Sequence, residues 1–229
     1  MDFVAGSTFF GVFLSLLAYV IGMWVKKKLR WSIFNPLLIA ILLVMGVLLI
    51  FGIDYETYYS GAKYLSYFLT PATICLAIPL YEKLQVLKHN WRAILAGILS
   101  GVLATLFGVL CIALLFSLDH SQYVTLLPKS ITTAIGIGVS EELGGLPTIT
   151  VAVIILSGIF GNMFGEVLCR WFRITDSVAR GIAIGSASHA IGTARAIELG
   201  QVEGAMSSLS IAVSGLITVV GASVFAQFL

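Results

Sequence analysis

Long apolar runs, separated by short polar connections, occupy almost the whole chain. A helix that crosses a bilayer needs roughly 20 mainly apolar residues, and each of these runs approaches or exceeds that length. The predicted spans are residues 6–25, 33–53, 64–81, 93–118, 147–169, 178–198 and 205–229. The pattern therefore predicts an all-α, polytopic transmembrane protein in which residues 1–229 form one integral membrane domain.

Composition agrees with the pattern and narrows the function classes. Of the 229 residues, 59% are hydrophobic and 10% are charged, and no segment remains for a soluble catalytic domain. We therefore expect no enzyme and no cofactor. The net charge of +2 is too small to indicate nucleic-acid binding. The three cysteines, Cys75, Cys111 and Cys169, show no paired spacing, and no cluster has the spacing of metal ligands.

Basic residues in the connections predict the orientation. Lys and Arg gather in cytoplasmic loops, and the chain has basic connections at 26–30, 83–92 and 170–180. The acidic connections near Asp54 and Asp119 then lie outside, with the N-terminus outside and the C-terminus inside. The first span precedes its basic cluster and has no cleavage site, so we interpret it as a retained anchor.

Residues 123–146 must return to the side on which they begin, because the spans on either side of them both have their adjoining ends outside. We expect a re-entrant or broken helix pair in this segment. Its Pro128, its glycines and its Ser/Thr side chains favour interrupted helices. Two short spans at this position remain the alternative.

The two halves of the chain resemble each other. The matching pairs are 35–39 with 146–150, 70–82 with 186–198, and 100–108 with 214–221. By the basic-loop count the copies run in opposite directions with three spans each, which is typical of inverted-repeat transporters; chance matches among apolar segments are the alternative. The predicted organisation is a first span and basic loop at 1–31, a first repeat at 32–118, a re-entrant or broken helix segment at 119–146 and an inverted second repeat at 147–229.

Polar residues concentrate at the interruptions of counterpart segments, which are predicted at 69–73 with Pro79 in the first half and at 185–188 with 192–193 in the second. Inverted-repeat transporters bind substrate where interrupted helices expose backbone groups near the bilayer midplane. The sequence therefore predicts a site for a small anion. Its candidate residues are Thr70, Pro71, Thr73, Lys129, Ser130, Thr132, Thr133, Ser186, Ser188, His189, Thr193 and Arg195.

For three ionisable residues of this set, the sequence leaves two interpretations open. Arg195 offers a fork of donors to a carboxylate, or forms a partial ion pair with Glu198 near a membrane edge. Lys129 binds the anion, or lies at the outer interface. His189 couples transport to protons, or is simply hydrogen-bonded within a helix contact.

Four separated motifs, in this order along nearly the whole chain, resemble the LrgB/CidB family. They are Phe34-Asn35-Pro36-Leu37-Leu38, Thr70-Pro71-Ala72 with Ala77 to Glu82, Leu127-Pro128-Lys129-Ser130-Ile131-Thr132-Thr133, and Gly185 to Arg195 followed by Glu203 to Leu209. The resemblance implies two competing functions. In one, holin/antiholin-like proteins act with small LrgA/CidA partners on murein hydrolase activity, autolysis and programmed cell death. In the other, family members move small carboxylates such as glycolate, glycerate and pyruvate.

Between these functions, the distribution of polar residues favours transport. A lytic pore needs a wide wet lumen, whereas polar residues here gather at helix interruptions. We expect a monocarboxylate carrier that works by alternating access in the bacterial cytoplasmic membrane, with indirect effects on autolysis. A homodimer and an elevator-like movement are expected by analogy with similar folds.

Overall fold

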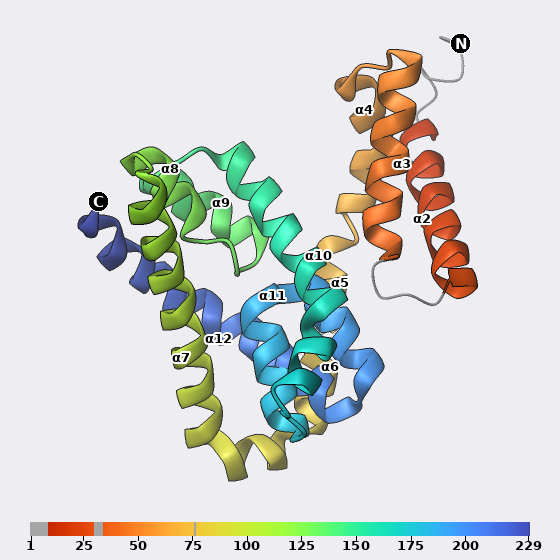
Figure 1. Cartoon of the computed structure of the whole chain (residues 1–229). Coiled ribbons are helices and arrows are strands. Elements are labelled where there is room, and N and C mark those ends of the chain that lie inside the picture. The colour runs from red at the N-terminus through yellow and green to blue at the C-terminus, as the bar shows by residue number, and fades with distance from the viewer. Residues whose placement is uncertain (1–8, 30–33, 76) are drawn as a thin grey trace. The chain divides into compact units, whose positions relative to one another are not determined.

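The computed structural model describes residues 9–29, 34–75 and 77–229, apart from the side chains at positions 69, 70, 73, 79 and 80. This part of the chain is helical and contains no strand, which confirms the all-α prediction. It divides into two compact units, Met1–Cys75 and Leu76–Leu229, which are described separately below (Figure 1). The predicted division into two repeats stays a prediction.

In the first unit, helix α2 packs against both α3 and α4, and α5 follows. The bounds are α2 Phe10–Leu29, α3 Pro36–Phe51, α4 Tyr55–Ser66 and α5 Leu69–Cys75. The side chain of Asn35 begins α3 by accepting from the amide of Leu37 at 2.8 Å. A Cβ on Gly22 would lie 2.5 Å from the carbonyl oxygen of Pro36, so only glycine permits the approach of α2 to α3.

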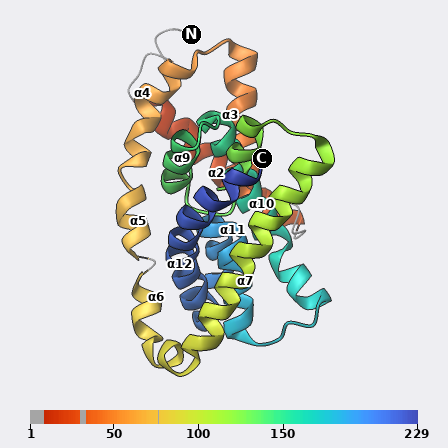
Figure 2. The same ribbon diagram turned by 90° about the vertical axis from the view of Figure 1, so that its left-hand side faces the viewer.

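The second unit contains three long apolar helices, α7, α10 and α12, with shorter helices between them (Figure 2). The bounds are α6 Ala77–Glu82, α7 Leu84–Phe116, α8 His120–Leu126, α9 Thr133–Glu142, α10 Pro147–Trp171, α11 Ser177–Leu199, α12 Gln201–Phe225 and the 3₁₀ helix Ala226–Phe228. Among the described residues, α2, α7, α10 and the helix from 201 to 228 are long and apolar enough to cross a membrane. A multi-pass membrane protein is therefore confirmed. The span predicted at 64–81 is divided among the end of α4, α5 and α6.

Helices α8 and α9 form a short hairpin beside α10. Thr150 of α10 donates its hydroxyl hydrogen to the carbonyl of Thr125 at 3.0 Å, and its hydroxyl oxygen lies 2.7 Å from that of Ser140, which is then the donor between the two hydroxyl groups. These two bonds tie both limbs to the same turn of α10. With 7 and 10 residues, neither limb is long enough to cross a bilayer of about 30 Å. The pair has the form expected of residues 119–146, while its re-entry into the membrane stays a prediction.

Helix α11 is broken at its centre. Ser188 has φ −137° and ψ 17°, and His189 has φ 41° and ψ −142°, neither of which is helical. The break separates a first arm, residues 177–187, from a second arm, residues 190–199. The interruption predicted within 185–193 is thus present at Ser188 and His189.

The two arms of α11 fold back on each other beside α12. A Cβ on Gly185 of the first arm would lie 2.7 Å from Cα of Ser207. In the second arm, Thr193 Oγ1 lies 2.7 Å from the hydroxyl oxygen of the same Ser207. The arms therefore run side by side, and α11 returns to the end of the unit at which it begins.

The prediction that residues 178–198 cross the membrane is therefore wrong. Each arm is about 15 Å long, half the thickness of the hydrocarbon core. The apolar composition misled because these residues are buried against α10 and α12 instead of facing lipid. The absence of a Cβ at Gly181, Gly185 and Gly192 allows that close packing.

The sequence places Asp119 and the C-terminus on opposite sides of the membrane, and the folded α11 contradicts this separation, while the side that each terminus faces stays a prediction. Helix α12 begins beside the start of α11, where Arg180 Nη2 lies 2.5 Å from Glu203 Oε1. It ends beside α8, where the carbonyl oxygen of Leu229 lies 2.7 Å from His120 Nδ1. The C-terminus therefore lies at the same end of the unit as Asp119, and not across the membrane from it.

We expect single cysteines at Asp119 and Phe228 to react from the same side of the membrane. A cysteine at Thr175 should react from the opposite side, because α10 leads to that end. The measurement is labelling with a membrane-impermeant maleimide in intact cells and in inverted vesicles, after replacement of the three native cysteines. Labelling of Asp119→Cys and Phe228→Cys from opposite sides would contradict the folded α11.

Candidate functional site

The break in α11 packs against two glycines, Gly158 and Gly161, in the middle of α10. A Cβ on Gly158 would lie 2.7 Å from Cε1 of His189, and a Cβ on Gly161 would overlap the side chain of Ser188. His189 is 3% exposed, and its Nε2 lies 2.9 Å from the carbonyl oxygen of Ile154. Because a carbonyl can only accept, Nε2 carries the hydrogen in this bond.

The backbone of His189 adopts a conformation that favours glycine. A positive φ with strongly negative ψ is sterically costly for a residue with a Cβ, of order 1–3 kcal/mol. Glycine would remove this cost, yet a buried histidine occupies the position. The hydrogen bond from its imidazole to Ile154 is a described side-chain contact that offsets part of the strain.

The hydroxyl groups around the break are satisfied within the protein. Ser188 Oγ donates to the carbonyl of Ile184 at 2.6 Å, and Thr193 Oγ1 donates to the carbonyl of His189 at 2.9 Å. Both side chains are buried. These predicted site residues therefore build the interior of the hairpin.

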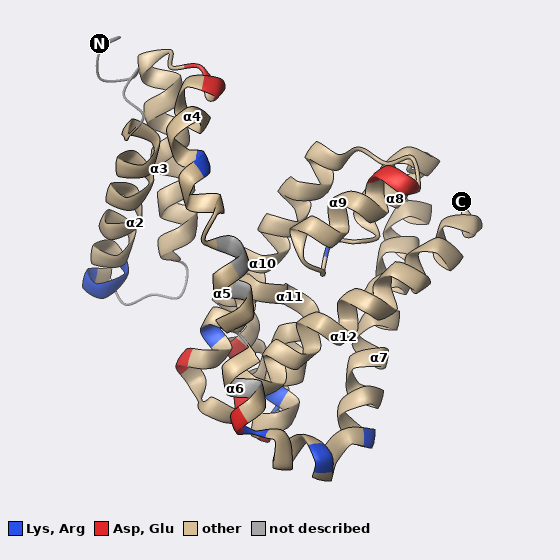
Figure 3. Ribbon diagram, turned by 180° about the vertical axis from the view of Figure 1, so that it is seen from behind, with Lys and Arg blue, Asp and Glu red and all other residues tan. Residues whose placement is uncertain are grey.

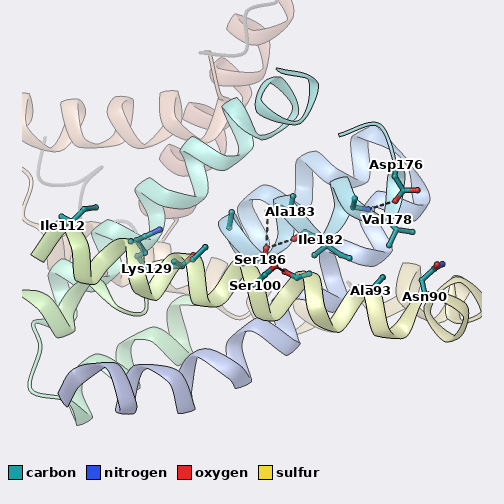
Figure 4. A pocket seen from close by; sticks show the side chains of 17 residues that line it. Asn90, Ala93, Ser100, Ile112, Lys129, Asp176, Val178, Ile182, Ala183 and Ser186 are labelled. Atoms are coloured by element: carbon teal, nitrogen blue, oxygen red, sulfur yellow. Dashed lines mark hydrogen bonds between the residues drawn. The ribbon is translucent and has the colours of Figure 1, made fainter. Parts of the chain in front are cut away.

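A cavity of about 1120 Å³ runs along one face of α7 (Figure 4). Its lining on α7 recurs every three or four residues, as expected for one helix face. The other wall is the first arm of α11, with Lys129 from the α8–α9 hairpin. The lining residues are Asn90, Ala93, Gly97, Ser100, Gly101, Ala104, Thr105, Gly108, Ile112, Lys129, Asp176, Val178, Ala179, Ile182, Ala183, Ser186 and Ala187.

Lys129 is the cation of this lining, and Figure 4 places it between Ile112 and Ser186 along the cavity. Its ammonium donates to the hydroxyl of Ser130 at 3.2 Å, and the ion pairs among the described residues do not include it. Ser186 donates its hydroxyl hydrogen to the carbonyl of Ile182, so it faces the cavity as an acceptor. Lys129 is thus the positively charged donor that the described lining of this cavity offers to an anion.

Arg195 does not line the cavity. Its guanidinium forms ion pairs at 2.5 Å with Glu166 of α10 and at 2.5 Å with Glu198, and Glu166 also pairs with Arg170. The structure thus agrees with the interpretation of Arg195 as an ion-pair partner of Glu198, and adds a second partner on α10. Glu166 was missed at the sequence level, although a carboxylate inside the apolar run 147–169 was a signal in itself.

Charged side chains gather at the end of the second unit where α7 begins (Figure 3). There Arg180 of α11 pairs with the buried Glu203 of α12. This pair and the pair between Arg195 and Glu166 fasten both arms of α11 to neighbouring helices. Both pairs lie away from the tip formed by Ser188 and His189.

The structure brings together only part of the predicted site. Lys129 and Ser186 share the cavity, and Ser130 is buried beside Lys129. Thr132 and Thr133 begin α9 without lining the cavity. Pro71 is exposed in the first unit, and the side chains of Thr70 and Thr73 lie outside the described residues. Their participation in an anion site stays a prediction.

Comparison with known proteins identifies the family. The model of the LrgB-like family matches residues 15–228. The chain belongs to the LrgB family. Two relatives, the antiholin-like proteins LrgB of Bacillus cereus (strain B4264) and Bacillus anthracis (strain CDC 684 / NRRL 3495), are each 37% identical over 222 residues, which is 96% of this chain and 96% of theirs. No solved structure matches the chain.

Membership of the LrgB family fits the helical, multi-pass architecture. The match reaches from within α2 to the end of the 3₁₀ helix that follows α12, and so includes the broken α11 and the hairpin that carries Lys129. The family resemblance inferred from the motifs is therefore confirmed.

Proposed function

We propose that the chain acts as an antiholin-like membrane protein. The observation that carries this proposal is the identity of 37% to antiholin-like LrgB proteins across 96% of both chains. In a bacterial cytoplasmic membrane it would restrain murein hydrolase activity and autolysis, together with a small LrgA/CidA-type membrane partner. A homodimer is the proposed assembly.

The cavity beside Lys129 favours a second candidate function, transport of small monocarboxylates. An ammonium at membrane depth without a paired carboxylate is costly unless an anion joins it. The broken α11 supplies the interrupted helix that many carriers place beside their substrate. Glycolate, glycerate and pyruvate are the proposed substrates, and altered autolysis would then be an indirect effect.

The antiholin-like function is tested in cells that lack the chain. We expect deletion to raise murein hydrolase activity and accelerate autolysis, and expression of the unmodified chain to reverse both. Turbidity during induced lysis and zymography of extracts measure the two effects. Unchanged lysis and hydrolase activity, with the small membrane partner present, would contradict the proposal.

The carrier is tested by reconstituting the purified chain in liposomes with labelled carboxylates outside and a large dye inside. A carrier gives saturable uptake, competed by unlabelled carboxylate, with the dye retained. Dye release without saturation indicates a pore instead. If liposomes show neither carboxylate uptake nor dye release, and the lysis phenotype depends on the partner, the antiholin-like regulator is supported and the carrier is not.

A further inference from the structure

Two helical hairpins approach each other from opposite ends of the second unit. The hairpin of α8 and α9 starts at the end where Leu229 contacts His120, whereas α11 starts at the end where Arg180 pairs with Glu203. In Figure 1, both hairpins lie along α10. Their tips reach the same residue of that helix, Ile154.

On one side of Ile154 is the tip of α11. His189 donates from Nε2 to the carbonyl of Ile154 at 2.9 Å, in the costly backbone conformation described above. Gly158, one turn further along α10, leaves room for the imidazole. The imidazole therefore fixes the tip of α11 to this turn of α10.

On the other side of Ile154 is the tip of the α8–α9 hairpin. A Cβ on Gly136 of α9 would overlap the end of the Ile154 side chain, and the same position lies 3.6 Å from Cβ of Pro128. Ile154 is completely buried in this contact. Thr150 ties the limbs of the hairpin one turn closer to their start, so Ile154 supports α9 at Gly136, and Gly136 in turn lies against Pro128, the residue before Lys129.

We propose that His189 is a positioning residue for Lys129. By holding the turn of α10 at Ile154, the imidazole fixes the surface on which Gly136 rests. Gly136 lies against Pro128, and this contact fixes where the ammonium of Lys129 enters the cavity. This role explains why a strained histidine occupies a position that favours glycine. It concerns the geometry of the second unit and does not depend on which of the two proposed functions is correct.

The test uses Ser130→Cys as a reporter in a chain whose native cysteines have been replaced. Ser130 is 5% exposed at the tip that carries Lys129, so its baseline reaction with a small, water-soluble thiol reagent is slow. His189→Gly removes the imidazole while allowing the backbone conformation, so the variant is expected to fold. We expect it to raise the labelling rate at least tenfold, and His189→Gln, which restores an N–H donor, to return the rate to within threefold of the reporter alone.

Asn162→Ala is the matched control. It removes the bond from Asn162 Nδ2 to the carbonyl of Ile191 at 2.7 Å, which also joins α10 to α11 but does not involve Ile154. We expect its labelling rate to stay within twofold of the reporter alone. An unchanged rate in His189→Gly, or an equal increase in Asn162→Ala, would overturn the proposal. The labelling rate requires no transport or lysis activity, so its outcome is independent of the tests of function.

Discussion

Gly161→Ala and Gly185→Ala are expected to destabilise the second unit, whereas the same change at glycines with free space around them is expected to stabilise the helices that contain them. A Cβ on Gly161 would overlap the side chain of Ser188, including its Cβ, and a Cβ on Gly185 would lie 2.5 Å from the carbonyl oxygen of Ser207. Neither neighbour is the free end of a flexible side chain, so helices must move apart. Forced overpacking costs about 1–3 kcal/mol, more than the helix propensity of alanine returns.

Gly108→Ala and Gly138→Ala are the matched controls for this prediction. A Cβ at either position meets no atom within 4 Å. Alanine should stabilise these helices by roughly 0.5–1 kcal/mol relative to glycine. The measurement is the midpoint of thermal unfolding in detergent together with the folded yield from membranes. Four variants with the same stability would show that α11 is not packed against α10 and α12 as described.

Lys129→Met is expected to lower carboxylate uptake at least tenfold if the chain is a carrier. A hydrogen bond to a charged group contributes about 1.5–3 kcal/mol, and each 1.4 kcal/mol is a factor of ten in affinity. Methionine keeps the length of the side chain and removes its charge. The concentration dependence of uptake in liposomes should show a raised half-saturation concentration.

Arg195→Met removes a cation of the same charge that does not line the cavity, and is the matched comparison. We expect its half-saturation concentration to stay near that of the unmodified protein. Its thermal stability should fall, because Glu166 and Glu198 lose a partner. Uptake that is equal in Lys129→Met and the unmodified protein would remove Lys129 from the proposed anion site. A raised half-saturation concentration in Arg195→Met would restore the substrate-binding reading of that residue.

The comparison of α10 with α11 shows how far hydropathy alone predicts this fold. Both segments are apolar on average, and the sequence predicts a crossing for each. Helix α10 is one continuous helix, and its glycines lie on the face against which α11 packs. In α11, serine and glycine surround the break, and the buried arms need partners on α12 that a local pattern does not contain. The interruption was predictable, but the return of the chain depends on tertiary contacts.

The candidate site shows a similar division. Lys129 and Ser186 lie far apart in sequence yet line one cavity, as the idea of converging interruptions predicts. Arg195 has the same chemical character but finds Glu166 one helix away. The spacing of Arg195 and Glu198 indicated part of this network. The contact with Glu166 could not be inferred, since it depends on how α11 lies against α10.

The dependence of α11 on α12 has a consequence for biogenesis. The arms of α11 leave the ribosome before Glu203 and Ser207, which pair with Arg180 and Thr193. Until α12 has been inserted, the polar interior of the hairpin lacks its lining. The second unit therefore cannot finish folding until its last helix, α12, is in place. A nascent chain arrested before α12 would contain an incompletely folded α11 that proteases of the quality-control system can recognise.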